Sequence, residues 1–458
     1  MKHPYLFAIL LPVAQLTLVA ADVPALDYTF FKERVQPIFL AKRAGHARCV
    51  TCHSHGAPPL QPLATGAGEW TEEQSRKNFA MWKAFVVPGD PLKSPMLVHP
   101  LAESAGGDRF HAGGKHWKSQ DDPEWQVLAA WVRGAKGGAN SKAARVLQTN
   151  AAGDTVDVID PATNQVVGVI EDIQVPHGVT IAPDGSRIYV TDESLSTLDV
   201  VDARTFKVTK RIPLTGRPNN VAVGEDGRQV YVGIAEAPGA VDVIDVESLT
   251  RSKSVPVKGA IHNVYVTPDG KFAVAGSIPG RTINVIDTAN NTLAWTLEMS
   301  GGLRPMAFTQ NADGSTKDII VQLSDFHGFA LVDFAARKEV RRVTLPDPPD
   351  APTETQGLQG APSHGLALSP DGKVLWVTSK VHDFVAAYSL PDCKLLKVVP
   401  VGLHPEWLTI PPDGRSLYVA VAGLDATVVV DTASMKVVKT IHVGAVPKRN
   451  TSGMLQTD

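Results

Sequence analysis

The chain has 458 residues, of which 43% are hydrophobic and 20% charged, and its formal net charge is −3. This length favours two domains over one. The near-neutral charge lacks the basic surplus of nucleic-acid-binding proteins, so nucleic acid is not an expected partner.

The first 21 residues have the pattern of a secretory signal peptide. Lys2 supplies the positive start, residues 6–19 form a short apolar core, and Val19-Ala20-Ala21 is a small-residue cleavage site. The apolar run is shorter than a comfortable membrane span, and an uncleaved anchor is the alternative. We expect a protein exported to the periplasm or elsewhere outside the cytoplasm, with no transmembrane segment after signal cleavage.

A short helix is predicted after Asp27, because Phe31, Val35 and Ile38 recur at helical spacing. Pro37 is expected to break or kink it. Two further helices are expected, one from a capping pattern at residues 71–74 and one from residue 122, the latter carrying Trp125 and Trp131. We therefore expect a small all-α domain over residues 22–138.

The run Cys49-Val50-Thr51-Cys52-His53 lies between the first two of these helices. C-x-x-C-H is the attachment signature of c-type haem. It predicts one haem c held covalently by Cys49 and Cys52, with His53 as the proximal iron ligand. A chance match, a redox dithiol and half of a zinc site are the alternatives. Since a zinc site needs a second ligand pair, and Cys393 is expected to be a passive thiol at a turn, that last alternative is weak.

Residues 27–135 resemble the single-haem cytochrome c domains of exported bacterial proteins, in which a helix precedes C-x-x-C-H and a Trp-bearing helix closes the domain. The resemblance implies a distal methionine before the last helix, but residues 106–117 contain none. His111, in this Gly-rich stretch, is the favoured distal ligand, and Met96 is the alternative. His99, His116, Met81 and an open site remain as further options.

Residues 139–144 read as a flexible linker, and a repeat follows it. Asp-Gly turns end at Gly185, Gly227, Gly270, Gly314, Gly372 and Gly414, with steps of 42, 43, 44, 58 and 42 residues. Four short strands per step of about 42 residues predict propeller blades. Inner strands are expected from residues 178, 220, 263, 305, 365, 407 and 450, which makes seven blades.

The last inner strand lies at the C-terminus, while its outer three strands are expected at residues 145–170. We therefore expect both ends of the repeat region to close the seventh blade of an all-β domain over residues 145–458. The repeat resembles the YVTN family of seven-bladed propellers. One blade carries an insertion over residues 345–362, of a kind that is found either at functional faces or as a tolerated loop.

Polar residues occupy one aligned position just before each expected inner strand. They form a ring that would converge at the mouth of the central channel: His177, Asn219, His262, Arg304, His364, Glu406 and Lys448. His404 and Arg449 join it in a wider interpretation. The histidines with Glu406 could bind copper, zinc or iron, whereas Arg304 and Lys448 favour an anionic substrate. A merely wet channel is the simplest alternative. His327, His382 and His442 lie off this register and are expected at the surface.

These features together predict haem-mediated electron transfer to or from a redox partner protein or a small-molecule substrate bound at the propeller. If the protein is an enzyme, it is a periplasmic oxidoreductase. The alternative is a non-enzymatic envelope binding protein whose haem is an electron wire or a sensor.

Overall fold

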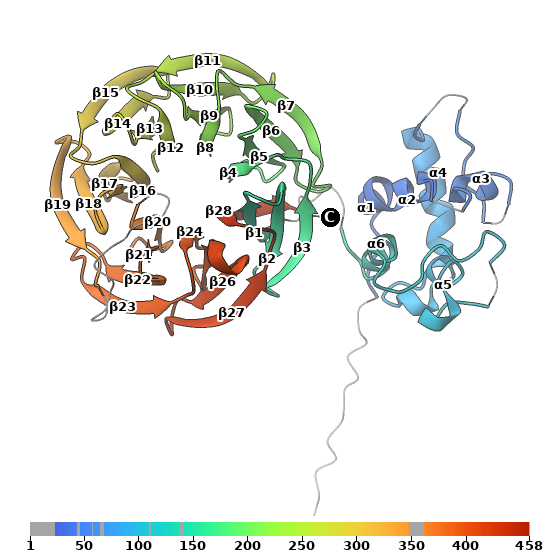
Figure 1. Ribbon diagram of the computed structural model, residues 1–458. Coiled ribbons are helices and arrows are strands. Elements are labelled where there is room, and N and C mark those ends of the chain that lie inside the picture. Colours follow the sequence, from blue (N-terminus) through green and yellow to red (C-terminus); the bar gives the residue numbers. More distant parts are fainter. Residues whose placement is uncertain are drawn as a thin grey trace, which may run out of the picture. The chain divides into compact units, whose positions relative to one another are not determined.

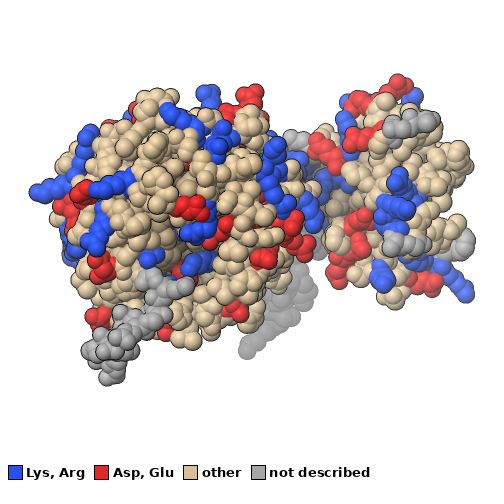
Figure 2. All heavy atoms as spheres, turned by 45° about the horizontal axis from the view of Figure 1, so that its top comes forward, with Lys and Arg blue, Asp and Glu red and all other residues tan. Residues whose placement is uncertain are grey.

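The computed structural model describes residues 23–43, 46–56, 58–64, 68–109, 111–136, 142–347 and 361–457. The chain divides into two compact units between Asn140 and Ser141, one of helices and one of β-sheets (Figure 1), and the sheets number seven. The expected signal peptide lies outside the described residues. In those residues, no helix has both the length and the apolar character that crossing a membrane requires. Acidic and basic side chains are interspersed on the face shown in Figure 2, as the small net charge suggests.

The first unit is a small region of short helices. They are α1 (Tyr28–Phe30), the π-helical η1 (Phe31–Val35), α2 (Gln36–Leu40), α3 (Cys49–His53), α4 (Glu72–Trp82), the 3-10 turns η2 (Lys83–Phe85) and η3 (Pro91–Lys93), α5 (Pro95–Val98), the 3-10 turn η4 (Glu103–Ala105) and α6 (Pro123–Val132).

The expected helix starts are confirmed by their caps. The Thr71 hydroxyl accepts from the Gln74 N–H at 3.3 Å while the Gln74 side chain accepts from the Thr71 N–H at 3.0 Å, which is a complete capping box. The Asp122 carboxylate accepts from the N–H of Glu124 at 3.0 Å at the start of α6. Trp131 of α6 is fully buried, and its indole N–H donates to the carbonyl of Asp27 at 2.9 Å. This hydrogen bond connects the last helix to the residue that caps the first.

The interruption expected at Pro37 lies one turn earlier. Helix α2 continues through Pro37 to Leu40, while η1 before it is a π turn in which the Gln36 N–H donates to the Phe31 carbonyl. Proline has no N–H and crowds the carbonyl four residues back. Widening the preceding turn accommodates the ring without ending the helix.

The second unit is a seven-bladed β-propeller, as predicted. Each blade is a four-stranded antiparallel sheet, and the inner strands surround the centre of the ring (Figure 1). The strands of each blade are given from inner to outer. The first three blades are blade 1, β4 (Pro176–Ile181), β5 (Arg187–Asp192), β6 (Thr197–Asp202) and β7 (Val208–Pro213); blade 2, β8 (Pro218–Val223), β9 (Gln229–Ile234), β10 (Ala240–Asp245) and β11 (Thr250–Pro256); and blade 3, β12 (Ile261–Val266), β13 (Phe272–Ser277), β14 (Thr282–Asp287) and β15 (Thr292–Glu298).

The other four are blade 4, β16 (Leu303–Gln310), β17 (Thr316–Leu323), β18 (Gly328–Asp333) and β19 (Lys338–Thr344); blade 5, β20 (Ser363–Leu368), β21 (Val374–Ser379), β22 (Phe384–Ser389) and β23 (Leu395–Pro400); blade 6, β24 (Pro405–Thr409), β25 (Ser416–Val421), β26 (Ala426–Asp431) and β27 (Lys436–His442); and blade 7, β28 (Pro447–Gln456), β1 (Lys142–Asn150), β2 (Thr155–Asp160) and β3 (Gln165–Ile170).

Both ends of the propeller sequence meet in blade 7, as predicted. Strand β28 pairs with β1 in a register that sets Gln456 against Lys142 and Asn450 against Gln148. Strand β1 begins at Lys142, so residues 142–144 belong to a strand and not to the linker. Residues 137–141 lie outside the described residues. The 3-10 turn η5 (Ala422–Leu424) joins β25 to β26.

The turn glycines have the left-handed backbone that their sequence pattern indicates. Gly185 has φ +73°, and a Cβ there would collide with the Met454 carbonyl of blade 7. A glycine is needed at this turn for both its conformation and its packing. The insertion lies between the end of β19 at Thr344 and the start of β20 at Ser363, and its residues 348–360 are outside the described residues.

Candidate functional site

Helix α3 is a single turn that brings the C-x-x-C-H side chains to one face. Cys49, Cys52 and His53 stand at i, i+3 and i+4, which are neighbours on a helix surface. All three line a cavity of about 500 Å³ within the helical unit. Its other walls are largely apolar and include Ile38, Phe39, Trp82, Trp117 and Leu128.

The His53 ring is held in one orientation. Its Nδ1 lies 2.8 Å from the Pro58 carbonyl oxygen, which only accepts, so Nδ1–H donates and Nε2 keeps a lone pair. The edge of the ring packs against Trp82 at 5.1 Å between centroids. Burial lowers the pKa of His53, so the imidazole is in the neutral form that binds metals.

His111 lines the same cavity and has the same arrangement. Its Nδ1 lies 2.7 Å from the Gly114 carbonyl oxygen, which again leaves Nε2 with the lone pair. Space beside this ring is scarce, since a Cβ at Gly113 would lie 3.0 Å from His111 Cε1. Two histidines with equivalent hydrogen bonds therefore share one cavity with two cysteines.

The remaining candidates for the second iron ligand differ in whether they line the cavity and in what they contact. Met96, His99 and His116 also line the cavity, whereas Met81 does not and is 40% exposed. His99 Nδ1 is engaged with the Asp108 carboxylate. Burial lowers the pKa of His116 to about 4, and its buried Nδ1 has no hydrogen-bond partner among the described residues. Met96 is buried.

These residues fit a covalently attached haem. The cavity volume lies in the range of small-molecule sites, and its walls are largely apolar. Two thiols would be available for covalent attachment and two imidazole Nε2 atoms for binding iron. Hydrogen bonds from Nδ1 to main-chain carbonyls are the usual means of orienting such ligands.

The polar ring in the propeller occupies the second residue of each inner strand, rather than the position before the strand. Every inner strand begins two or three residues earlier than expected. The pairing register of each shifts at this point, for example between Pro176 and Val179 and between Ser363 and Leu366. Such bulges re-aim side chains. The pattern of apolar residues marks only the part of the strand that follows the bulge.

Contacts between blades show that the ring residues converge. Arg449 of blade 7 donates to the side chain of Asn219 in blade 2. Arg304 NH1 lies 3.4 Å from His262 Nε2. The ring centroids of His262 and His364 are 5.6 Å apart although one blade separates their strands.

Glu406 is a buried hub in this ring. Its carboxylate lies 2.6 Å from the Lys380 ammonium, 3.4 Å from that of Lys448 and 3.4 Å from His364 Nδ1. Burial alone would raise the pKa of Glu406, but Lys448 and Lys380 outweigh it and hold the pKa below its ordinary value.

Arg449 is the most deeply buried cation of the ring. It is 1% exposed, its guanidinium lies 4.3 Å over the Trp407 ring, and its Nε and NH1 have no hydrogen-bond partner among the described residues. Burial lowers its pKa to about 10. Arg449, Trp407 and Tyr265 line a small cavity of about 280 Å³ between inner strands.

The ring histidines are neutral at pH 7. Burial and then Arg449 lower the pKa of His177 to about 4, although Nδ1 donates to the Glu193 carboxylate. The pKa values of His262 and His364 are lowered well below the usual value, chiefly by burial. His177 Nε2 has no partner among the described residues.

Sequence reasoning missed the partners of the ring. Glu193, Ser324 and Lys380 each directly follow the second strand of a blade and contact His177, Arg304 and Glu406 respectively. The sequence does contain a pattern that could have identified two of them. In blades 1 and 5 the second strand ends in Thr-Asp or Thr-Ser, and the partner is the polar residue that follows. His404, from the wider interpretation, has a left-handed backbone, and its N–H donates to the Asp383 carboxylate.

Two of the three off-register histidines are less exposed than expected. The side chains of His327 and His382 are only 14% and 7% exposed, whereas His442 is exposed as expected. The two partly buried histidines lie in turns before third strands, where adjacent blades pack together, and a repeat pattern within one blade does not reveal such positions.

No family model matches the chain, and no curated protein matches it. Solved structures are similar in fold: Kuenenia stuttgartiensis hydrazine synthase (24% identity, TM-score 0.55, 63% of this chain and 92% of that chain), a 6-phosphogluconolactonase-like protein from Bacteroides fragilis (19%, 0.56, 69% and 99%) and the dihydro-haem d1 dehydrogenase NirN in complex with DHE (15%, 0.50, 79% and 91%). At these identities the similarity concerns the propeller fold.

Proposed function

We propose that the protein is an exported c-type cytochrome fused to a propeller, and that it moves electrons between a haem and a substrate or redox partner protein at the propeller. One observation carries this proposal. His53 and His111 each bond through Nδ1 to a main-chain carbonyl and line one cavity with Cys49 and Cys52. This pairing orients two imidazoles for one metal centre.

The residues have distinct roles in this proposal. The Cys49 and Cys52 side chains would hold the haem through thioether bonds formed by adding each thiol across a vinyl group, and His53 and His111 would bind the iron, with Met96 as the alternative to His111. The bound haem supplies one-electron chemistry. The apolar walls exclude water, and two histidines set a lower potential than a histidine with a methionine would.

The channel supports a small anion as the substrate class. Arg449 Nε and NH1 are buried donors without partners, and His177 Nε2 is an acceptor without one, among the described residues. A ligand with an anionic group and a hydroxyl or N–H would satisfy both, at far lower cost than leaving them buried and unpaired. Arg304, Lys380 and Lys448 add positive charge nearby.

Copper, zinc or iron at His177, His262, His364 and Glu406 is the competing interpretation of the channel. The cations around these residues oppose a divalent ion, since like charges at short range in a buried site repel strongly. Nε2 of His262 already faces the Arg304 guanidinium. We therefore favour the anion.

A non-enzymatic envelope protein, with the haem as wire or sensor, is the second candidate. The propeller fold is compatible with it, because this fold serves enzymes and binding modules alike. NirN, one of the structures with a similar fold, is a dihydro-haem d1 dehydrogenase, and this supports the redox role by analogy alone. Electron exchange with an added small anion that is abolished by Arg449→Gln would support an enzyme. Electron exchange with a protein partner alone would support the non-enzymatic envelope protein.

The haem assignment is tested on the purified full chain by absorption spectra of the oxidised and reduced protein. We expect covalently bound haem with a six-coordinate spectrum. His111→Ala is expected to abolish six-coordination or allow carbon monoxide to bind, while Met96→Leu and His116→Ala leave the spectrum unchanged. A shift in the Met96 variant alone would overturn the choice of His111, and a wild-type protein without covalent haem would overturn the proposal.

A further inference from the structure

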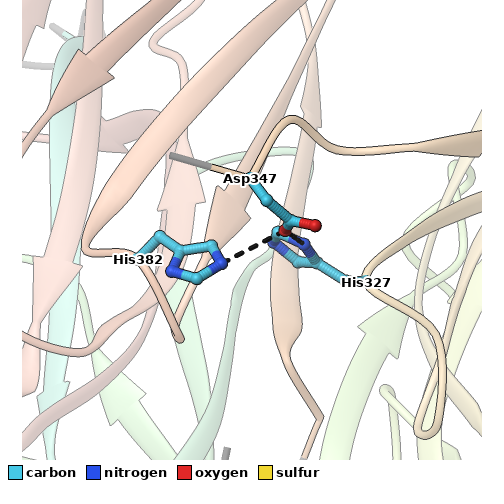
Figure 3. A group of neighbouring side chains, drawn as sticks. All are labelled: His327, Asp347 and His382. Atoms are coloured by element: carbon cyan, nitrogen blue, oxygen red, sulfur yellow. Dashed lines mark hydrogen bonds and ion pairs between the residues drawn. The ribbon is translucent and has the colours of Figure 1, made fainter. Parts of the chain in front are cut away.

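A second cluster of ligand-type side chains lies in the propeller, apart from the channel ring. His327 is in the turn between β17 and β18, His382 in the turn between β21 and β22, and Asp347 follows β19. Figure 3 shows the three side chains pointing toward one another. Among the described residues, this is the one group of three His, Cys, Asp or Glu side chains whose ligand atoms all lie within 4.8 Å of one another.

The distances suit a metal ion. Asp347 Oδ1 lies 2.9 Å from His327 Nδ1 and 3.2 Å from His382 Nε2. Two atoms that each lie about 2.0 Å from a tetrahedral zinc ion are about 3.3 Å apart. These two separations are therefore close to those of ligand pairs around one small ion, and the third pair lies within 4.8 Å.

Neighbouring residues hold both imidazoles in place. The other nitrogen of His327, Nε2, lies 2.8 Å from the Ser379 hydroxyl, a second hydrogen bond of the kind that orients metal-ligating histidines. The His382 ring stacks on Phe384, with an interplanar angle of 16°. The two histidines come from adjacent blades, so their approach is fixed by the packing of blades 4 and 5.

The ligand types select the class of ion. Two imidazoles with one carboxylate suit zinc and similar first-row divalent ions, whereas calcium and magnesium prefer sets of oxygen ligands. Asp347 is 63% exposed, so the cluster is open to ions from solvent.

We propose that His327, Asp347 and His382 bind a divalent transition ion of the zinc class, with a fourth coordination position open toward solvent. The ion joins blades 4 and 5 where the insertion leaves β19. This site is separate from the haem cavity and from the channel ring, and it does not depend on the proposed function.

The test uses the full-length protein equilibrated with zinc chloride, then dialysed and analysed for metals. We expect one zinc per chain in wild type besides any haem iron, and a rise in melting temperature on adding zinc. Asp347→Asn, at an exposed position that folding tolerates, and His382→Ala should each weaken zinc binding at least tenfold and remove the shift.

His442→Ala, an exposed histidine on β27, and His177→Ala, in the channel ring, serve as matched controls and should keep the zinc. Wild-type protein without zinc, or Asp347→Asn protein with unchanged zinc affinity and melting shift, would overturn the proposal. Loss of the ion in His177→Ala instead would assign it to the channel.

Discussion

The helical unit and the propeller use buried histidine in different ways. In the helical cavity, the partners of His53 and His111 are main-chain carbonyls at most five residues away. In the channel, His177 bonds to the Glu193 carboxylate, 16 residues away, and His262 contacts the Arg304 guanidinium, 42 residues away. A main-chain carbonyl fixes the tautomer of a histidine without adding charge, and so leaves the other ring nitrogen available to a metal. The channel histidines instead lie among charged side chains, and the cations among them favour an anionic ligand.

The largest effect is expected from replacing the two cysteines that we propose attach the haem. Cys49→Ser combined with Cys52→Ser should abolish covalent haem completely and destabilise the helical unit, because its central cavity then loses its filling. The propeller transition should be unchanged, since each unit has its own core. Haem retained on a denaturing gel and the two melting transitions report these effects.

Cys393→Ser is the control for thiol chemistry, as Cys393 is buried in the propeller. Covalent haem surviving the double substitution would contradict the role of the two thiols.

Glu406→Gln is expected to have the next largest effect, on the propeller alone. It leaves Lys380 and Lys448 facing a neutral group in a buried site, and breaking a buried ion pair costs about 3 kcal/mol or more. The denaturant midpoint of the propeller transition measures it. Glu298→Gln, whose pair with Lys258 is at the surface, should leave that midpoint unchanged. Equal effects of the two substitutions would show that the buried ion pairs of Glu406 contribute no more to stability than a surface pair does.

Acid should weaken the propeller through its buried histidines. The folded pKa of His177 is about 4 against 6.5 for the exposed side chain, so the unfolded chain takes up protons first as the pH falls below 6.5. Stability is therefore full above that pH and declines toward pH 4, by about 2 kcal/mol for His177 between pH 7 and 5.

Urea unfolding at pH 7, 6 and 5 measures this loss. His177→Gln should flatten the dependence, and His442→Gln should not. A wild-type midpoint that stays constant from pH 7 to 5 would show that His177 is not held neutral.

The smallest expected effect concerns the helical unit. Thr71→Ala removes the capping-box acceptor at the start of α4, which should lower the stability of this unit by about 1 kcal/mol without shifting the propeller transition. Thr71→Ser keeps the hydroxyl and should restore most of the loss. A shift of the propeller transition in Thr71→Ala would contradict the independence of the two units.

Sequence patterns predicted local features well and contacts between blades poorly. The seven-bladed fold followed from the recurring Asp-Gly turns, and the cavity histidines His53 and His111 lie near their own hydrogen-bond partners in the sequence. The start of each inner strand was displaced because the bulge interrupts the alternation of apolar residues. Lys380 and the His327–Asp347–His382 cluster were missed because each depends on packing between adjacent blades, and no period within one blade encodes it.

The pairing of β28 with β1 also sets an order in time. A ribosome adds residues from the N-terminus, so the helical unit is complete in the growing chain roughly three hundred residues before β28 exists. During that interval β1 has an unpaired edge, and ring closure awaits a contact between segments far apart in sequence, which is intrinsically slow. The helical unit can therefore complete its own folding before the propeller closes.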